Sequence, residues 1–136
     1  MKITIAVVIV AVVLVLLGCG HKAVSSTGDD SGNFRQVSSD EGRRLMAEGS
    51  GYIIVDVRTR QEYDNGHIPK AICIPNESID QTPPDELKDK NQEIFVYCRS
   101  GRRSKQAAQK LANMGYTNII EFGGINDWRG EITTEK

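Results

Sequence analysis

One cysteine in this chain stands where a nucleophile would be expected. Cys98 follows a short apolar run at 94–97, and a stretch with helical periodicity begins six residues after it. The loop between them carries three arginines, Arg99, Arg102 and Arg103. The thiolate is the reactive form of cysteine, and neighbouring positive charge favours it. This arrangement therefore predicts covalent chemistry in which Cys98 attacks an anionic substrate.

The backbone of the same loop should also stabilise a negative charge on sulfur. The amide groups of residues 99–103 can form a concave anion site, and Gly101 permits the backbone angles that such a turn needs. A helix that begins at Arg103 or Ser104 would direct its unpaired amides and positive dipole end toward Cys98. We expect the pKa of Cys98 to lie below its ordinary value of about 8.5. The alternative is an inert, buried cysteine at the end of a strand.

Five short apolar runs are candidates for the strands that position this loop. They occupy residues 34–37, 52–57, 71–74, 93–97 and 118–122, and the first of them is the weakest. Short runs without alternation are typical of strands covered on both faces. We expect the run before Cys98 to lie at the centre of the sheet. Ligands of such sheets bind at the carboxyl ends of the strands, which is where Cys98 stands.

Helical signals alternate with these runs. A Ser-x-x-Glu capping box at 38–41 predicts a helix that ends near Gly49. Another helix is expected to begin around residues 83–86, and from Ser104 onward an apolar face repeats at helical spacing until Gly115. Strands that alternate with helices indicate an α/β domain with a mostly parallel sheet.

The N-terminal segment has the pattern of a bacterial lipoprotein signal. Residues 3–17 contain no charge, and as a helix they would rise only about 22 Å, less than the hydrocarbon core of about 30 Å. The sequence "LLGCG" that follows resembles a lipobox, which predicts a signal peptide at 1–18 and lipidation of Cys19. The alternative is an uncleaved single-pass anchor. In both cases the protein would be tethered to a membrane of the bacterial cell envelope, facing away from the cytoplasm.

Composition separates a polar tether from the folded part. Residues 19–33 are small and polar without periodicity, which predicts a flexible tether, and residues 34–134 are expected to form one globular domain. The formal net charge of −1 gives no reason to expect nucleic acid as a partner. His21, His67 and the cysteines show no metal-ligand spacing, so neither a metal nor an organic cofactor is predicted.

Three motifs, in order and suitably spaced, resemble the rhodanese-like sulfurtransferases. They are "DVRTRQEYDNGHIPKAICIP" at 56–75, "YCRSGRRS" at 97–104 and "GYTNIIEFGGINDW" at 115–128. Two positions depart from the family pattern: Lys70 replaces a glycine, and Cys73 replaces a residue that is more often polar. The resemblance implies a central, mostly parallel five-stranded sheet with helices on both faces.

The same resemblance implies two-step sulfur transfer by a monomer. The thiolate of Cys98 would take the outer sulfur from a small anionic donor such as thiosulfate, and the persulfide would pass it to cyanide, to a thiol or to a redox protein. Asp56 and Arg58 are expected to brace the loop, and Arg58 could also pair with Glu62, four residues on. The residues implied to bind the donor are Arg99, Ser100, Gly101, Arg102, Arg103 and Ser104.

Two other functions are alternatives, and the residue count disfavours the first. A cysteine phosphatase would need its arginine after five intervening residues, at the position of Ser104, whereas Arg103 comes after four. A non-enzymatic module that carries a persulfide and docks a partner would use the same loop.

Three further residues have simple structural interpretations. His67 fits a structural turn better than a general base, and Trp128 fits the core or a lid near the pocket. Cys73 is expected to pack as a small apolar residue. A Cys73–Cys98 disulfide is not expected, because the family's strand order places another strand between them.

Overall fold

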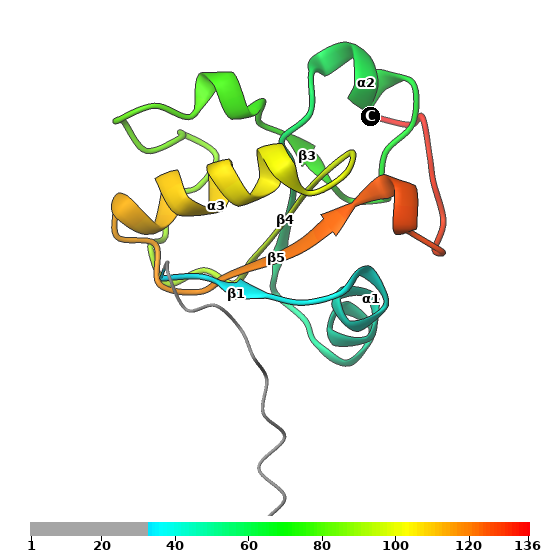
Figure 1. The fold of residues 1–136 in the computed structure, drawn as a ribbon, viewed down its shortest axis with the longest axis horizontal. Coiled ribbons are helices and arrows are strands. Elements are labelled where there is room, and N and C mark those ends of the chain that lie inside the picture. The colour runs from blue at the N-terminus through cyan, green and yellow to red at the C-terminus, as the bar shows by residue number, and fades with distance from the viewer. Residues whose placement is uncertain (1–32) are drawn as a thin grey trace, which may run out of the picture.

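Five parallel strands form one sheet in a computed structural model that describes residues 33–136 (Figure 1). Their order across the sheet is β1-β5-β4-β2-β3, and every neighbouring pair is parallel. The strands are β1 (Arg35–Gln36), β2 (Ile53–Asp56), β3 (Ile72–Cys73), β4 (Ile94–Cys98) and β5 (Ile119–Gly124). The predicted α/β fold is confirmed.

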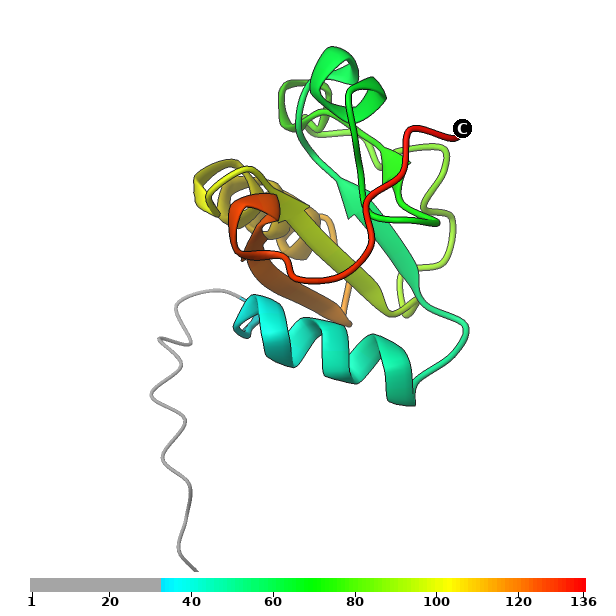
Figure 2. The ribbon, with the colours of Figure 1, turned by 90° about the vertical axis from the view of Figure 1, so that its right-hand side faces the viewer.

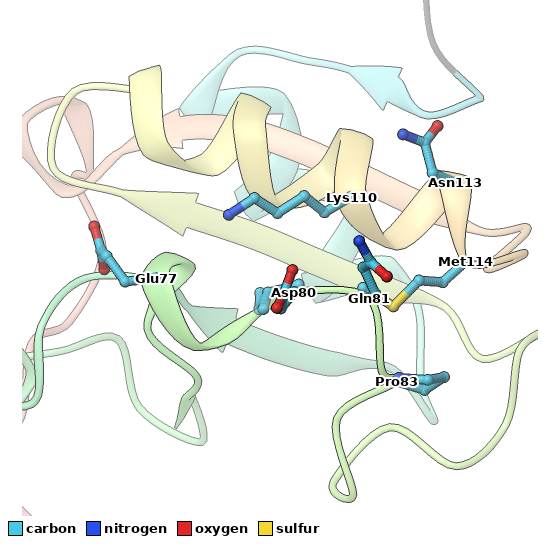
Figure 3. A pocket seen from close by; sticks show the side chains of 8 residues that line it. Glu77, Asp80, Gln81, Pro83, Lys110, Asn113 and Met114 are labelled. Atoms are coloured by element: carbon cyan, nitrogen blue, oxygen red, sulfur yellow. The ribbon is translucent and has the colours of Figure 1, made fainter.

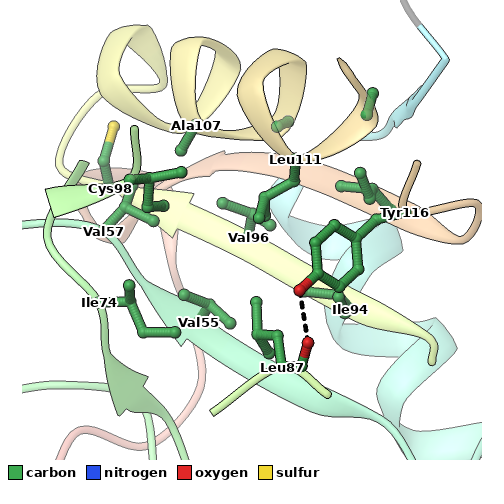
Figure 4. Close-up of a cluster of buried hydrophobic side chains, with 14 residues drawn as sticks. Val55, Val57, Ile74, Leu87, Ile94, Val96, Cys98, Ala107, Leu111 and Tyr116 are labelled. Carbon is green, nitrogen blue, oxygen red and sulfur yellow. Dashed lines mark hydrogen bonds between the residues drawn. The ribbon is translucent and has the colours of Figure 1, made fainter. Parts of the chain in front are cut away.

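The strand that carries Cys98 lies at the centre, as the sequence predicted. All five residues of β4 are buried, because helices and loops cover the sheet on both sides. Its side chains alternate between two apolar clusters, which is why the strand is continuously apolar. Val96 and Cys98 point to the cluster under α3 (Arg102–Asn113), as Figure 4 shows, whereas Phe95 and Tyr97 point to the other.

Helices cover both faces of the sheet. Figures 1 and 2 show α3 on one face and α1 (Ser39–Glu48) on the other. Met46 of α1 packs with Phe122 of β5, and the apolar face of α3 packs on the opposite side of the same strand. Residues 33–136 also form the short helix α2 (Arg60–Asp64) and two 3₁₀ turns, η1 (Asn76–Ser78) and η2 (Ile125–Asp127).

The ends of the long helices follow from their sequence. The Ser38 side chain accepts a hydrogen bond from the Glu41 amide at 3.1 Å, and α1 ends before Gly49 as predicted. Gly115 ends α3 with φ at +94°, a conformation that glycine adopts without a steric penalty. The helix begins at Arg102, slightly earlier than expected.

The helix expected around residues 83–86 does not form. The segment makes a single turn, in which the Leu87 amide bonds to the Pro84 carbonyl at 3.0 Å. Carbonyls that a helix would use accept hydrogen bonds from a distant segment of the same chain. The Leu87 carbonyl accepts from the Tyr116 hydroxyl, drawn in Figure 4, and the Lys90 carbonyl accepts from the Thr117 amide at 2.9 Å. Tertiary hydrogen bonds therefore replace the helical ones.

The structure does not describe residues 1–32. The predicted signal at 1–18, with Cys19 and all of the tether at 19–33 except residue 33, therefore lies outside the described residues. Within residues 33–136, no helix has the length and apolar character needed to cross a bilayer.

Candidate active site

Cys98 lies at the carboxyl end of β4, directly beneath the start of α3 (Figure 4). Its side chain is almost fully buried, with 1% of the residue exposed. The sulfur accepts a hydrogen bond from the Gly101 amide at 3.0 Å, and it lies 3.5 Å from the Ser104 hydroxyl oxygen. The loop and the first turn of α3 therefore present polar hydrogens to the thiol.

Glycines allow the loop to take this shape. Gly101 has φ at +105°, in the region that glycine favours, and this conformation aims its amide at the sulfur. Gly124 of β5 is the register partner of Cys98, and the loop crosses directly over it. The Arg99 carbonyl also accepts a hydrogen bond from the Asn126 amide at 3.2 Å, which ties the loop to η2.

The surroundings of Cys98 favour its thiolate. Burial raises the pKa of the Cys98 thiol, but hydrogen bonds from the Ser104 hydroxyl and from the amides of Ser104, Gly101 and Ser100 outweigh burial and lower it overall. The lowered pKa agrees with the expectation from sequence. Its principal physical causes are the hydroxyl and the amides, whereas the sequence had also pointed to the arginines.

The three loop arginines have different surroundings. Arg103 makes a two-pronged ion pair with Glu62, at 2.8 and 2.9 Å, and is partly buried. Its guanidinium holds the pKa of Glu62 at about 2, although burial of the carboxyl acts in the opposite direction. Arg99 and Arg102 are exposed, and neither forms a salt bridge to another described residue.

Asp56 and Arg58 form a buried ion pair that joins several segments. The Arg58 guanidinium contacts the Asp56 carboxylate at 2.6 Å and donates to the Gly66 carbonyl at 2.7 Å. Tyr97 of β4 donates its hydroxyl to the same carboxylate at 2.7 Å and accepts from the Ile68 amide at 3.1 Å. The predicted pair between Arg58 and Glu62 is wrong, because Arg58 turns inward to Asp56 while Glu62 bonds to Arg103.

His67 and Trp128 lie in packed surroundings. The His67 ring stacks on Tyr63, with centroids 3.6 Å apart, and its Nδ1 lies 2.8 Å from the Tyr63 carbonyl oxygen. Its backbone pairs with Thr133 of the C-terminal segment. Trp128 packs against Phe122 with ring centroids 5.7 Å apart, and its indole N–H donates to the Glu131 carbonyl.

The two described cysteines are free and differ in their environment. Cys73 lies on β3, and β2 separates that strand from β4, so the observed strand order keeps the two thiols apart. Burial raises the pKa of Cys73, whereas the hydrogen bonds described above lower that of Cys98. The contrast marks Cys98 as the more reactive of the two thiols.

Sequence reasoning missed one residue at the site, Glu121 on β5. Its carboxylate is buried and accepts a hydrogen bond from the Ser104 hydroxyl at 2.6 Å. The signal was present, because Glu121 interrupts the apolar run at 118–122. A single acidic residue in such a run is uninformative until the fold shows which side chain it meets.

A pocket of about 600 Å³ lies away from Cys98 (Figure 3). It is formed by the segment after η1 and the second half of α3, with Lys110 on one side and Asp80 on the other. Acidic, basic and apolar side chains share its walls, so its charge selects no class of ligand. Among residues 33–136, no cluster of three or more histidine, cysteine or acidic side chains is arranged to hold a metal ion.

Comparison with known proteins places this site in a family. Residues 38–131 match the family described as "Rhodanese-like domain". The chain belongs to the rhodanese-like family. It is 38% identical over 73 residues to the thiosulfate sulfurtransferase PspE of Escherichia coli, covering 54% of this chain and 70% of PspE. It is also 33% identical to a sulfurtransferase of Allochromatium vinosum, covering 68% of this chain and 86% of that protein.

A solved structure agrees with the rhodanese assignment. The structure described as "rhodanese with anions from E. coli" is 33% identical, with a TM-score of 0.57, and the match covers 62% of this chain and 99% of that one. Several other relatives are longer proteins: the chain spans 27% of the UBA4 adenylyltransferase and sulfurtransferase of Candida albicans. The family is therefore a sulfurtransferase family, in which a rhodanese-like domain also occurs as part of larger proteins.

Proposed function

We propose that this rhodanese-like domain moves the outer sulfur of thiosulfate, or of a related donor, to a thiophilic acceptor through a persulfide on Cys98. The observation that carries the proposal is the Cys98 thiol, which the loop after β4 surrounds with hydrogen-bond donors. Cys98 is held by the Gly101 amide and the Ser104 hydroxyl, and its pKa is lowered. The likeness to PspE, a thiosulfate sulfurtransferase, supports thiosulfate as the donor.

In the first step, the Cys98 thiolate attacks the outer sulfur of thiosulfate. A new S–S bond forms, the bond between the two thiosulfate sulfurs breaks, and sulfite leaves with the bonding electron pair. The outer sulfur then carries the negative charge, which the loop amides and the N-terminus of α3 are placed to stabilise. Arg99 and Arg102, which are exposed beside the loop, supply positive charge that attracts the dianionic donor.

In the second step, an acceptor nucleophile attacks the outer sulfur of the persulfide. Cyanide gives thiocyanate, and a thiol gives a new persulfide on the acceptor. The Cys98–sulfur bond breaks, and its electron pair returns to Cys98 as thiolate. Such a cycle consists of two half-reactions and predicts ping-pong kinetics.

The experiment is intact mass spectrometry after thiosulfate treatment, together with an assay of thiocyanate formation. The wild-type domain should gain one sulfur after the treatment, and peptide analysis should place it on Cys98. Cys98→Ser should lose both the added sulfur and the activity, whereas the matched variant Cys73→Ser should keep both. Activity that survives in Cys98→Ser would refute the mechanism.

A second candidate function is a persulfide carrier that docks a partner without multiple turnover. The observation that favours it is the similarity, at 29% identity, to the putative sulfur carrier protein YrkF of Bacillus subtilis. The two functions differ in their kinetics. A carrier would accept one sulfur on Cys98 but release it slowly to cyanide and small thiols, whereas an enzyme would turn over repeatedly.

A cysteine phosphatase is disfavoured by the surroundings of Arg103. The arginine that would clamp a phosphate group is bound to Glu62 by two hydrogen bonds, and it stands one residue too early in the loop. The domain should therefore hydrolyse para-nitrophenyl phosphate negligibly. Efficient hydrolysis, without sulfur transfer from thiosulfate, would reverse the assignment.

The cellular location is a separate proposal that rests on the N-terminal sequence. The apolar run at 3–17 and the sequence "LLGCG" support lipidation of Cys19 and attachment to a membrane of the bacterial envelope, facing away from the cytoplasm. Mass spectrometry of membrane-extracted protein should find Cys19 as the first residue, with lipid attached. A mature protein that retains residues 3–17 would indicate an uncleaved anchor instead.

A further inference from the structure

A buried carboxylate lies two hydrogen-bonding steps from the thiol. Glu121 of β5 is 2% exposed, and its side chain lies on the face of the sheet that α3 covers. One carboxylate oxygen, Oε1, accepts from the Ser104 hydroxyl at 2.6 Å and from the Gly123 amide at 2.8 Å. The same hydroxyl oxygen lies 3.5 Å from the Cys98 sulfur. Ser104 therefore stands between two groups that can each become an anion.

The Ser104 hydroxyl oxygen also lies 3.0 Å from the Gly101 carbonyl and 3.2 Å from the Gly123 carbonyl. The hydroxyl has one proton, and it cannot serve both Cys98 and Glu121. When it donates to Glu121, its oxygen faces Cys98 as an acceptor, which suits the protonated thiol. When it donates to a Cys98 thiolate, Glu121 loses its nearest donor and keeps only the Gly123 amide. A buried carboxylate with fewer donors is less stable as an anion. The two ionised forms thus compete for a single hydrogen bond.

We propose that Glu121 and Cys98 share one negative charge through the Ser104 hydroxyl, so that formation of the Cys98 thiolate is coupled to protonation of Glu121. The proton of the thiol passes to the Ser104 oxygen, and the proton of Ser104 passes to Oε1 of Glu121. No electron transfer and no outside reactant are needed. Glu121 acts through Ser104 and is therefore a positioning residue for the nucleophile.

The groups around Glu121 leave the pKa of its carboxyl raised. Burial raises the pKa of Glu121, and the hydrogen bonds from Ser104 and Gly123 and the Lys105 ammonium on α3 oppose that rise without cancelling it. On the neighbouring strand β1, the register partner of Glu121 is the uncharged Gln36. On the side of the thiol, the Arg103 guanidinium interacts electrostatically with Cys98.

A path for proton exchange with solvent also reaches Glu121. The residue lines an open pocket of about 290 Å³, together with Ser100, Gly101 and Lys105. Protons can therefore be exchanged with solvent at this pocket, which Glu121 lines and Cys98 does not. This inference deepens the proposed function, because the same Cys98 would carry the persulfide. It concerns the ionisation of the thiol, which can be measured without any sulfur donor.

The test is the pH dependence of Cys98 alkylation by iodoacetamide in the wild-type domain and in Glu121→Gln. Glutamine keeps the shape of the side chain but carries no charge, so it attracts the Ser104 hydroxyl proton less than the carboxylate does and leaves that proton for Cys98. The pKa read from the alkylation profile should fall by about one unit, the size expected for strongly coupled sites. At a pH below both values, alkylation should therefore be several times faster than in wild type.

A double-variant cycle separates the relay from a simple effect of charge. In the Ser104→Ala background, adding Glu121→Gln should leave the pKa of Cys98 unchanged, because the connecting hydroxyl is gone. An unchanged pKa in the single Glu121→Gln variant would overturn the proposal. The same shift in both backgrounds would overturn it too, because Glu121 would then act without Ser104. Failure of sulfur transfer from thiosulfate, with the alkylation result intact, would count against the proposed function alone.

A second measurement applies if Glu121→Gln does not fold. The carboxyl carbon of Glu121, observed by ¹³C NMR in the wild-type domain, should titrate in two steps, the second at the pH where Cys98 ionises. In Cys98→Ser it should titrate in one step, because no second anion shares the proton. A single step in both proteins would refute the coupling.

Discussion

Gly124 is the residue at which β5 passes under the Cys98 loop, and an alanine there has no room for its methyl group. A Cβ atom at this position would lie 2.0 Å from the Arg99 carbonyl oxygen and 2.6 Å from the Ser100 nitrogen. Both atoms belong to the loop backbone, so no side-chain rotation can relieve the contact. The φ angle of Gly124 is −144°, which any residue adopts, so the obstacle is purely steric.

The distance by which the loop must move sets the expected loss of activity. Real Cβ atoms keep at least 3.0 Å from such neighbours, so the Arg99–Ser100 peptide must move by about 1 Å or more. That peptide precedes the Gly101 amide, which donates to the Cys98 sulfur at 3.0 Å. A misplacement of about 1 Å at a catalytic group can cost on the order of a hundredfold in rate. Overpacking of this kind should also lower stability by about 1–3 kcal/mol.

The assay compares kcat/KM for thiosulfate and cyanide in Gly124→Ala with that of a matched control, Gly51→Ala. Gly51 also has a positive φ, +72°, but a Cβ there would contact nothing within 4 Å, and the residue lies outside the Cys98 loop. The control should lose a little stability through backbone strain and keep its activity. Gly124→Ala should lose about a hundredfold at a temperature where both variants are folded. Full activity in a folded Gly124→Ala domain would refute the view that this backbone contact sets the loop geometry.

Two further predictions concern the ion pairs. Asp56→Ala should lower the free energy of unfolding by about 3–5 kcal/mol, because it leaves the buried Arg58 charge unpaired; a loss below about 1 kcal/mol in chemical denaturation would contradict this. Glu62→Gln removes a carboxyl whose folded pKa, about 2, lies below the unfolded value near 4.5. The stability advantage of wild type over Glu62→Gln, about 1 kcal/mol or less for a partly exposed pair, should be complete above the unfolded pKa and vanish as pH falls toward 2. Thermal unfolding at several pH values measures it, and an advantage that grows toward low pH would contradict it.

The fold class could be predicted because the apolar runs and helix caps that indicate it are local features of the sequence. A strand buried on both faces must be apolar along its whole length, so the runs around Val55, Val96 and Ile120 predicted parallel strands before any contact was known. The capping residue Ser38 and the terminating Gly115 act within one turn of their helices, and both lie where the sequence placed them. The helix expected near residue 83 failed for the opposite reason. Its carbonyls are taken by Tyr116 and Thr117, which are distant in the chain.

The nucleophile and its loop could be identified without any knowledge of the fold. Cys98, the glycine that lets the loop turn and the helix that follows are contiguous, so the direction of the amides toward sulfur follows from local geometry. The polar partners of that loop come from distant segments. Folding of the whole chain brings Arg103 to Glu62, 41 residues away, and turns Arg58 to Asp56 instead. Only the pairing of β4 with β5 carries Glu121 to the Ser104 hydroxyl. Long side chains can reach several partners with similar energy, and packing of the whole sheet selects among them.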